Sequence, residues 1–410
     1  MSSDKNEHDS NPLCVFPVEV CDLIFQHVTG AELLLASEVS PSFYNFVAGA
    51  KRCMKKIKLK FVGGKLSKDE KSILLGSGRK FESLEVSGSH VEASGEIFIM
   101  EGMTWTSVCI SSVNFETVNH VLDYLRVFQS TVQELVMNRV YIERNLEPHL
   151  ELPADLQFPN LKTLEMKCCL ASFYDRAFVN CKNLTTLSIK SGGEMRSSSL
   201  QAIKTILKSN KFLKVLRIHF QVFSLIFSED ISTEIPFKLK EFHADDLYRV
   251  PGHRMHVKHN LNQFLMTQRE TLEAVTIGEW MGTEVVKTVF AMPRLKDVTL
   301  KGFGCVNLLY SEAAWFSQNN SVMNLNFQDK SSDIKLLKNI LIAFPCLKSL
   351  KIYTMDQAAT DLIPNICKSL EILSIEYIHA QNVPNKMFFK KLQEFSCRKF
   401  DPLASELFCA

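Results

Sequence analysis

The hydrophobic positions of this chain repeat along most of its length. An apolar residue is followed three and five residues later by two more, as in Leu161, Leu164 and Met166. The motif occurs fourteen times, with first positions at 54, 81, 105, 132, 161, 184, 213, 239, 272, 295, 322, 347, 370 and 392. The steps between copies run from 22 to 33 residues and average 26. A period of this size indicates a repeat protein.

Each copy predicts a short strand, and many copies also predict a helix. The last two apolar positions are two residues apart, so they share one face of a strand. Between copies the spacing is often helical, as for Ile203, Ile206 and Leu207. One strand and one helix cannot bury their apolar side alone, whereas stacked copies form a continuous core. We therefore expect an α/β fold, a curved solenoid with a parallel sheet on its concave face and helices or loops outside; an ordinary α/β domain is the alternative.

A different pattern precedes the repeats and predicts three short helices. The first has an apolar face from Val20 to Val28 and is expected to end at Gly30. The second contains Leu33, and the third begins at a Ser40-Pro41 cap. Three short helices have too little surface to close a core of their own. A partner or the adjoining repeats must therefore cover the excess apolar area.

Composition and charge exclude several classes of protein. Apolar residues make up 46% and charged residues 22% of the 410, which is typical of a well-packed chain, and the net charge is only +2. This charge gives no reason to expect a nucleic-acid or membrane partner. No apolar run approaches the roughly 18 residues of a membrane span, and the polar, acidic N-terminus is unlike a signal peptide. We expect a cytoplasmic or nuclear protein.

The cysteines and histidines are the candidate metal-binding residues of the sequence. Twelve cysteines occur without a C-x-x-C pair, so we expect small buried hydrophobes rather than disulfides or a zinc site. The longest step contains His243, Asp245, His253, His256 and His259, which could bind a metal, but a polar loop gives the same letters. We therefore predict no metal and no cofactor. No G-x-S-x-G, phosphate-binding glycine loop or H-E-x-x-H occurs, which favours a protein that is not an enzyme.

The segment before the repeats resembles the F-box motif. The family's Leu-Pro-x-Glu opening corresponds to FPVE at 16–19, its Ile-Phe pair to 24–25, its Asp-Leu-Leu to ELL at 32–34, and its Val-Cys/Ser-x-x-Trp ending to VSPSF at 39–43. Phenylalanine replaces leucine at the start and tryptophan at the end, which should alter packing but leave docking intact. The repeats resemble degenerate leucine-rich repeats, because only Cys169 clearly meets the family's Asn or Cys position. An F-box followed by leucine-rich repeats is itself a family architecture.

The resemblance implies a substrate-recognition subunit of a Skp–cullin–F-box ubiquitin ligase. The F-box would dock a Skp-type adaptor, which binds a cullin–RING ligase, and the repeats would bind an unidentified target protein. Catalysis would occur elsewhere in the complex, so this chain would be non-catalytic. The alternative is an interaction scaffold without degradation. The implied divisions are a tail at 1–15, an F-box at 16–53, about 13–14 repeats at 54–400 and a tail at 401–410. The residues implied in adaptor docking or its support are Pro17, Ile24, Phe25, Leu33, Val39 and Phe43.

Residues that alternate with the buried strand positions are expected on the concave face. Their charges are mixed, so they form neither a polybasic groove nor an acidic trap. Arginine and tyrosine dominate the energetics of protein interfaces. We therefore predict target contacts at Arg217, His219, Lys351 and Tyr353.

Overall fold

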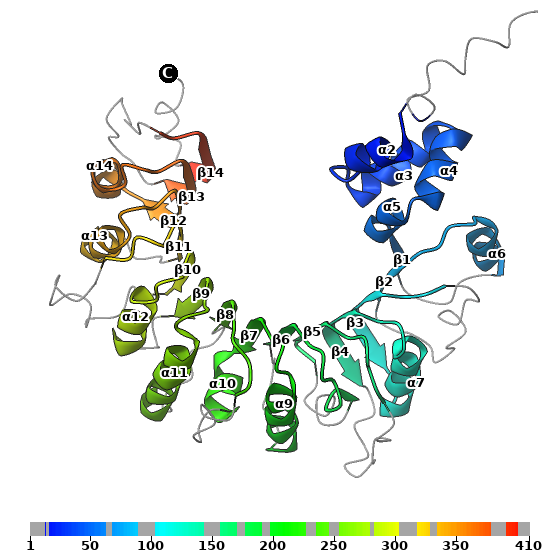
Figure 1. Ribbon diagram of the computed structural model, residues 1–410, viewed down its shortest axis with the longest axis horizontal. Coiled ribbons are helices and arrows are strands. Elements are labelled where there is room, and N and C mark those ends of the chain that lie inside the picture. Colours follow the sequence, from blue (N-terminus) through cyan, green and yellow to red (C-terminus); the bar gives the residue numbers. More distant parts are fainter. Residues whose placement is uncertain are drawn as a thin grey trace, which may run out of the picture. The chain divides into compact units, whose positions relative to one another are not determined.

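The computed structural model consists of repeated strands and helices in two compact units (Figure 1). The first unit comprises residues 1–184 and 191–206, and the second comprises 185–190 and 207–410. The structure describes residues 13, 16–62, 68–88, 103–142, 156–169, 177–190, 197–226, 235–245, 254–278, 283–302, 318–328, 334–378 and 391–400. The predicted F-box and the first repeats lie together in the first unit.

Four helices stand before the first described strand: α2 (Val18–Phe25), α3 (Gly30–Val39), α4 (Pro41–Gly49) and α5 (Lys51–Lys56). The first three correspond to the predicted helices, and Ser40 caps α4 with Pro41 in its first turn, as expected. The predicted role of Gly30 is wrong. It begins α3 instead of ending α2, because Thr29 and Glu32 form a capping box at this point.

Five parallel strands follow in the first unit. They pair in chain order, with Leu84 beside Val108, Val108 beside Leu135, and Leu135 beside Leu164. The strands are β1 (Lys58–Val62), β2 (Ser83–Ser87), β3 (Ser107–Phe115), β4 (Glu134–Ile142) and β5 (Thr163–Lys167). The helices between them are α6 (Lys68–Gly76) and α7 (Val118–Phe128). Strands β2 to β5 contain the predicted apolar pairs. The copy predicted at 54 is two residues out of register, because Leu59 of β1 pairs with Leu84 and Phe61 pairs with Val86.

Nine parallel strands belong to the second unit and also pair in chain order. They are β6 (Thr186–Lys190), β7 (Val215–His219), β8 (Glu241–Asp245), β9 (Ala274–Gly278), β10 (Asp297–Lys301), β11 (Asn324–Gln328), β12 (Ser349–Met355), β13 (Ile372–Ile378) and β14 (Glu394–Phe400). The helices are α10 (Phe220–Ile226), α11 (Arg254–Gln268), α12 (Thr283–Phe290), α13 (Ile334–Ala343) and α14 (Gln357–Ile366), while α9 (Ser197–Ser209) contains residues of both units. Figure 1 shows the helices on one side of these strands. The predicted α/β solenoid of parallel strand–helix repeats is confirmed.

The core is built from the repeated apolar positions. Leu161, Leu164 and Met166, for example, are fully buried. Phenylalanine rings fill the space between strands and helices, and the rings of Phe242 and Phe264 lie 5.3 Å apart. Each such side chain contributes about 1.5–3 kcal/mol on burial. Because alternate strand residues point into this core, the residues between them form the opposite, polar face of the sheet.

The cysteine prediction is confirmed in part. Cys21, Cys53, Cys169, Cys181 and Cys367 are buried as free thiols. Burial raises the pKa of the Cys181 and Cys367 thiols to about 12. Contrary to the prediction, Cys346 is exposed in a turn, and Cys109 and Cys168 are half-buried on the polar face of β3 and just beyond β5. Cys397 is also half-buried, although it pairs with the buried Ile375, because it lies on β14, the last strand of the sheet. No helix in the described ranges is long and apolar enough to cross a bilayer.

Candidate functional site

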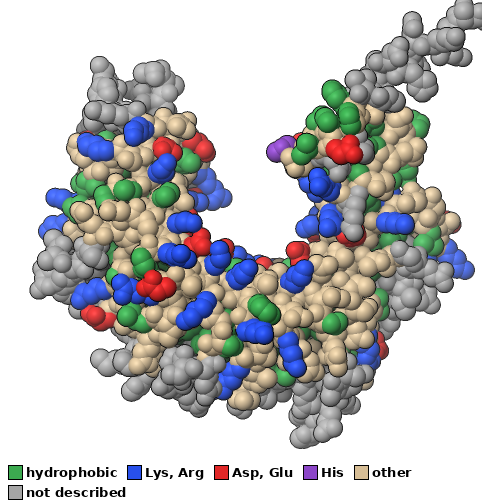
Figure 2. Space-filling model, viewed as in Figure 1, with side chains coloured by type: hydrophobic (Ala, Val, Ile, Leu, Met, Phe, Trp, Pro, Cys, Tyr) green, Lys and Arg blue, Asp and Glu red, His purple; other side chains and the backbone are tan. Residues whose placement is uncertain are grey.

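The N-terminal helices carry an unusual share of exposed apolar surface. Of the fourteen large apolar side chains that are exposed in the described residues, eight lie between residues 16 and 75. Four of them stand on α2 and α3, and we call these four the exposed apolar set: Leu23, Ile24, Leu35 and Val39. Figure 2 shows hydrophobic side chains gathered on this helical segment. Leu23 and Ile24 are neighbours on α2, and Leu35 and Val39 are one turn apart on α3. Exposed apolar groups of this kind are typical of a surface that a partner covers.

The six residues implied in adaptor docking divide into two groups. Pro17, Ile24 and Val39 are exposed, and Val39 retains 73% of its surface. Of the other three, Leu33 is buried, whereas Phe25 and Phe43 are half-buried and pack against aromatic rings of the segment. Leu33 is fully buried, and the ring of Phe25 lies 6.2 Å from that of Phe43 and 5.2 Å from that of Phe46. Leu33 therefore positions the helices, while Phe25 and Phe43 both hold the helices together and reach the surface.

Leu23 and Leu35 belong to the exposed apolar set but were not predicted. Leu23 was predicted on the same apolar face of the first helix as Ile24 but was not named as a docking residue. Leu35 is part of the run Leu33-Leu34-Leu35, which puts apolar residues on every side of α3. One side of such a helix must face solvent or a partner, and this was the signal that could have identified Leu35. A hollow of about 430 Å³ adjoins the set at Val39, between the end of α3 and the start of α4.

Lys56, the last residue of α5, joins α2 to the segment that precedes β1. Its Nζ donates hydrogen bonds to the backbone carbonyls of Phe25 (3.1 Å), Gln26 and Val28 (2.8 Å). These carbonyls lie at and just beyond the end of α2, where the regular helical hydrogen bonds stop and a cation is favoured. Lys56 therefore holds the helix that carries Leu23 and Ile24.

A second connection joins α3 and α4 to the first repeat. The guanidinium of Arg79 donates to the Ser37 hydroxyl (2.7 Å) and lies 4.7 Å from the centre of the Tyr44 ring. The Tyr44 hydroxyl in turn donates to the carbonyl of Ser77, just beyond α6. The N-terminal helices are thus fixed to the repeats by charged and aromatic contacts, without a flexible linker between them.

The polar strand face of the second unit contains two clusters. The first spans β7, β8 and β9. Arg217 forms an ion pair with Glu241 (3.5 Å), which is also 3.5 Å from His243 Nε2. His243 Nδ1 lies 2.7 Å from the Thr276 hydroxyl. Arg217 is about one-third exposed, so the predicted contact residue is available at the surface but held in place by its neighbours.

The position predicted for His219 is wrong. It was expected two residues beyond Arg217 on the exposed face, yet only 2% of its surface is accessible. The reason is local, because α10 begins at the next residue and the chain turns over the end of β7. His219 is therefore not available to a partner in this structure.

The second cluster spans β12, β13 and β14. The rings of Tyr353 and Tyr377 lie 5.0 Å apart, and a hydrogen bond between their hydroxyls raises the pKa of Tyr353. Arg398 donates to Glu376 at 2.6 Å, which raises the pKa of the guanidinium. Lys351 is exposed beside this cluster on β12. The predicted residues Lys351 and Tyr353 thus both lie at this cluster. The cluster presents the aromatic pair Tyr353 and Tyr377 beside the ion pair of Arg398 and Glu376.

The histidine-rich insertion lies largely outside the residues that the structure describes. His253 and the side chains of Asp245, His256 and His259 are not among the described residues, while the backbone of the last two lies in α11. His243 is described and contacts Thr276 and Glu241. The described residues contain no group of three possible metal ligands.

Comparisons with known proteins add fold likeness alone. No protein-family model and no curated protein matches the chain. Among solved structures, the chain is similar to the yeast complex of Rad7 and Elc1 (14% identity, 92% of each chain, TM-score 0.45) and to an internalin of Listeria monocytogenes (10% identity, 92% and 96%, TM-score 0.36). A TLR13–ssRNA13 complex matches 85% of this chain at 14% identity (TM-score 0.39), and the match spans 42% of the TLR13 chain. None of these values supports a functional argument.

The fold and the two surfaces together define the general character of the protein. It is a solenoid of leucine-rich-type repeats, whose stacked strands present a long polar face. Repeat proteins use such extended faces to bind other proteins. The described features are those of a protein-interaction scaffold.

Proposed function

We propose that this chain is the substrate-recognition subunit of a ubiquitin ligase of the Skp–cullin–F-box type. The N-terminal helices dock a Skp-type adaptor, and through it a cullin–RING ligase. The strand face of the repeats binds the target protein. Ubiquitin transfer takes place on the E2 enzyme of the ligase, so no catalytic residue is assigned to this chain.

The observation that carries the proposal is the exposed apolar set. Leu23, Ile24, Leu35 and Val39 remain exposed while the rest of their segment has a well-formed core around Leu33. Burying each of these side chains against a partner is worth about 1.5–3 kcal/mol. A few such anchors are enough for a stable complex. This set coincides with the F-box resemblance at Ile24 and Val39.

The attachment of the N-terminal helices to the first repeats also supports an adaptor role. Lys56 and Arg79 fix the docking helices to the first repeats through hydrogen bonds. A rigid connection keeps a bound target within reach of the ligase and raises its effective concentration there. The proposed role is cytoplasmic or nuclear and requires neither a nucleic acid nor a membrane.

The experiment is co-expression with a Skp-type adaptor, followed by size-exclusion chromatography with mass measurement. Three chains are compared: wild type, Ile24→Ala/Val39→Ala, and Val62→Ala/Ile73→Ala. The control pair is at least as exposed, at 78% and 73%, but lies outside α2–α4. Because all four side chains are exposed, neither variant should change folding, which circular dichroism verifies.

The expected result is a stoichiometric complex for wild type and for the control, and loss of the complex for Ile24→Ala/Val39→Ala. If wild type purifies alone as a monodisperse protein, the adaptor role is wrong. If the adaptor binds but a cullin added to the purified complex does not join it, the chain is a non-degradative interaction scaffold.

A further inference from the structure

The turns that lead into the strands of the second unit form a continuous surface. We call it the strand-entry edge, and it consists of residues 210–214, 235–240, 269–273, 291–296, 318–323, 344–348, 367–371 and 391–393. Each turn is hydrogen-bonded to the previous one: Lys240 N donates to Lys214 O, and Lys296 N donates to Glu273 O, both at 2.8 Å. The same bond recurs along the series to Gln393. The turns therefore lie side by side at about the 4.8 Å spacing of the strands.

Basic side chains are concentrated on this edge. It contains ten lysine or arginine residues and three glutamates, although the whole chain has a net charge of only +2. The cations are Lys211, Lys214, Lys238, Lys240, Arg269, Arg294, Lys296, Lys348, Lys368 and Lys391. All ten are exposed. Figure 2 shows Lys and Arg side chains over the visible face of this unit, with fewer carboxylates among them.

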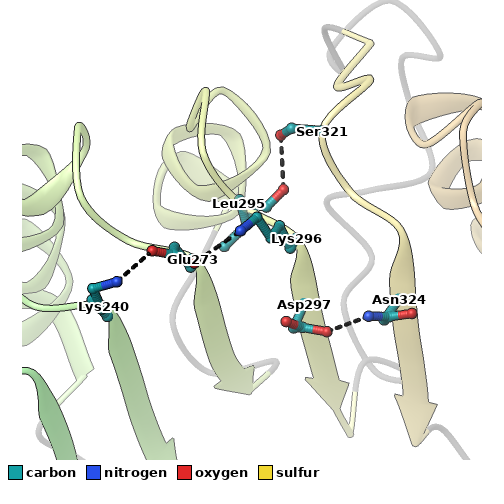
Figure 3. Close-up of polar contacts among 7 residues, drawn as sticks. All are labelled: Lys240, Glu273, Leu295, Lys296, Asp297, Ser321 and Asn324. Carbon is teal, nitrogen blue, oxygen red and sulfur yellow. Dashed lines mark hydrogen bonds and ion pairs between the residues drawn. The ribbon is translucent and has the colours of Figure 1, made fainter.

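The glutamates order part of this row without neutralising it. Glu273 lies between Lys240 and Lys296, 3.0 Å from each Nζ, as Figure 3 shows for these three residues. One carboxylate thus holds two cations. Lys214 and Arg294 have no ion pair within the described part of the chain. The edge keeps a surplus of positive charge at fixed spacing.

A hollow opens in the middle of the edge, at the turns before β9, β10 and β11. It has a volume of about 580 Å³, and its lining includes Arg269, Pro293, Gln318 and Asn320. Its floor is rigid, because Asn319 donates to the carbonyls of Phe290 and Met292, both at 2.8 Å, and Ser321 donates to Leu295 (Figure 3). Arg269 offers a guanidinium to a carboxylate placed there.

Two apolar side chains complete the surface. Phe212 is 55% exposed in the turn before β7, and Met323 is 40% exposed in the turn before β11. Four strand spacings separate them, or about 19 Å, which an extended segment of six or seven residues covers. Exposed apolar residues within a basic row favour a ligand that has both acidic and apolar groups.

We propose that the strand-entry edge binds an acidic, partly apolar segment of a partner protein. Its carboxylates pair with the cation row, one of them enters the hollow beside Arg269, and its apolar residues contact Phe212 and Met323. That this segment belongs to the target protein of the ligase rests on the proposed function. The binding itself needs no adaptor, so the two can fail separately.

A nucleic acid fits the same charges less well. Hydrogen bonds from Lys296 and Lys240 lower the pKa of Glu273 to about 2, so its carboxylate stays ionised in the centre of the row. Glu270 and Glu371 are also on the edge. A continuous phosphate backbone would pass close to all three, whereas a peptide can place neutral or apolar residues opposite them.

Fluorescence anisotropy with the full chain tests the proposal. The probes are a labelled 15-residue peptide of alternating acidic residues and leucine, the same peptide with Asn and Gln in place of Asp and Glu, and a 15-nucleotide single strand. The variant is Lys214→Glu/Arg294→Glu. The control is Lys335→Glu/Lys338→Glu on the outer helix α13, which changes the net charge by the same amount.

We expect the acidic peptide to bind wild type and its amide counterpart not to bind. The edge variant should weaken binding at least about tenfold, and the control less than about twofold at physiological salt. The proposal is overturned if the acidic peptide does not bind, if both variants weaken binding equally, or if the nucleotide strand binds more tightly than the peptide. Adaptor binding measured on the same samples tests the proposed function separately.

Discussion

The backbone of Gly30 lies directly against the carbonyl group of Lys56, and a Cβ at position 30 would overlap the Lys56 oxygen. This contact explains why a glycine begins α3. It brings the first turn of α3 against the end of α5 and so places the docking helices next to the first repeat. The contact also explains why Gly30 does not act as the helix terminator that its position after an apolar stripe suggested.

Replacing Gly30 with alanine should therefore destabilise the N-terminal helices. The added methyl group requires a backbone shift, and such overpacking costs about 1–3 kcal/mol. Gly49→Ala is the matched control, because a Cβ there meets no atom within 4 Å. It should leave stability unchanged or raise it by up to about 1 kcal/mol. Thermal unfolding of both variants measures the difference, and equal stability would contradict the close contact.

Lys56→Met should loosen α2. The substitution keeps the aliphatic stem but removes the donor to the carbonyls of Phe25, Gln26 and Val28. We expect a loss of about 1–3 kcal/mol and weaker adaptor binding, because Leu23 and Ile24 are no longer fixed. Lys55→Met, at the exposed neighbouring position, should change neither. Urea unfolding followed by an adaptor-binding titration tests this, and identical behaviour of the two variants would contradict it.

Asn319→Ala should be the most damaging change in the turns of the second unit. The Asn319 side chain is buried, donates to two carbonyls and accepts from the backbone N–H of Ser321 at 2.9 Å. Its removal leaves buried groups without partners, at a cost of about 1–3 kcal/mol. Asn320→Ala, at the exposed next position, should cost less than about 0.5 kcal/mol. Denaturant unfolding compares the two, and an inert Asn319→Ala would refute the role of this turn.

Glu273 should make stability depend on pH. Hydrogen bonds from Lys296 and then Lys240 lower its folded-state pKa to about 2, below the usual value of about 4.3 for the unfolded chain. The stabilisation is thus fully present above pH 4.3 and is lost as the pH falls toward 2. The melting temperature of wild type should exceed that of Glu273→Gln at pH 6 and converge with it at pH 2. A difference in melting temperature that stays constant from pH 6 to pH 2 would contradict this role of Glu273.

The repeats were predictable because each one contributes three apolar residues, at the same spacing, to one core. Leu161, Leu164 and Met166 predicted β5 directly, and the helical stripe at 203–207 predicted α9. The errors came from contacts that have no periodicity. His219 follows the strand alternation but is covered where α10 begins, and Gly30 owes its place to a carbonyl 26 residues away.

The candidate surfaces were predictable to different degrees. Ile24 and Val39 were predicted from the F-box resemblance. Leu35 was not, because a run of three leucines does not indicate which of them faces outward. The strand-entry edge was missed because its lysines occur singly, one or two in each repeat, and only stacking aligns Lys214, Lys240 and Lys296. A sequence pattern shows which residues recur, but three-dimensional stacking decides which of them become neighbours.

Hydrogen–deuterium exchange of the chain, alone and mixed with a Skp-type adaptor, locates the adaptor-binding surface. We expect slower amide exchange on binding in α2, α3 and α4, with the strands β6–β14 unchanged and still free to hold a target. Protection confined to those strands, with none in α2–α4, would contradict the proposed function and make the repeats themselves the adaptor-binding surface.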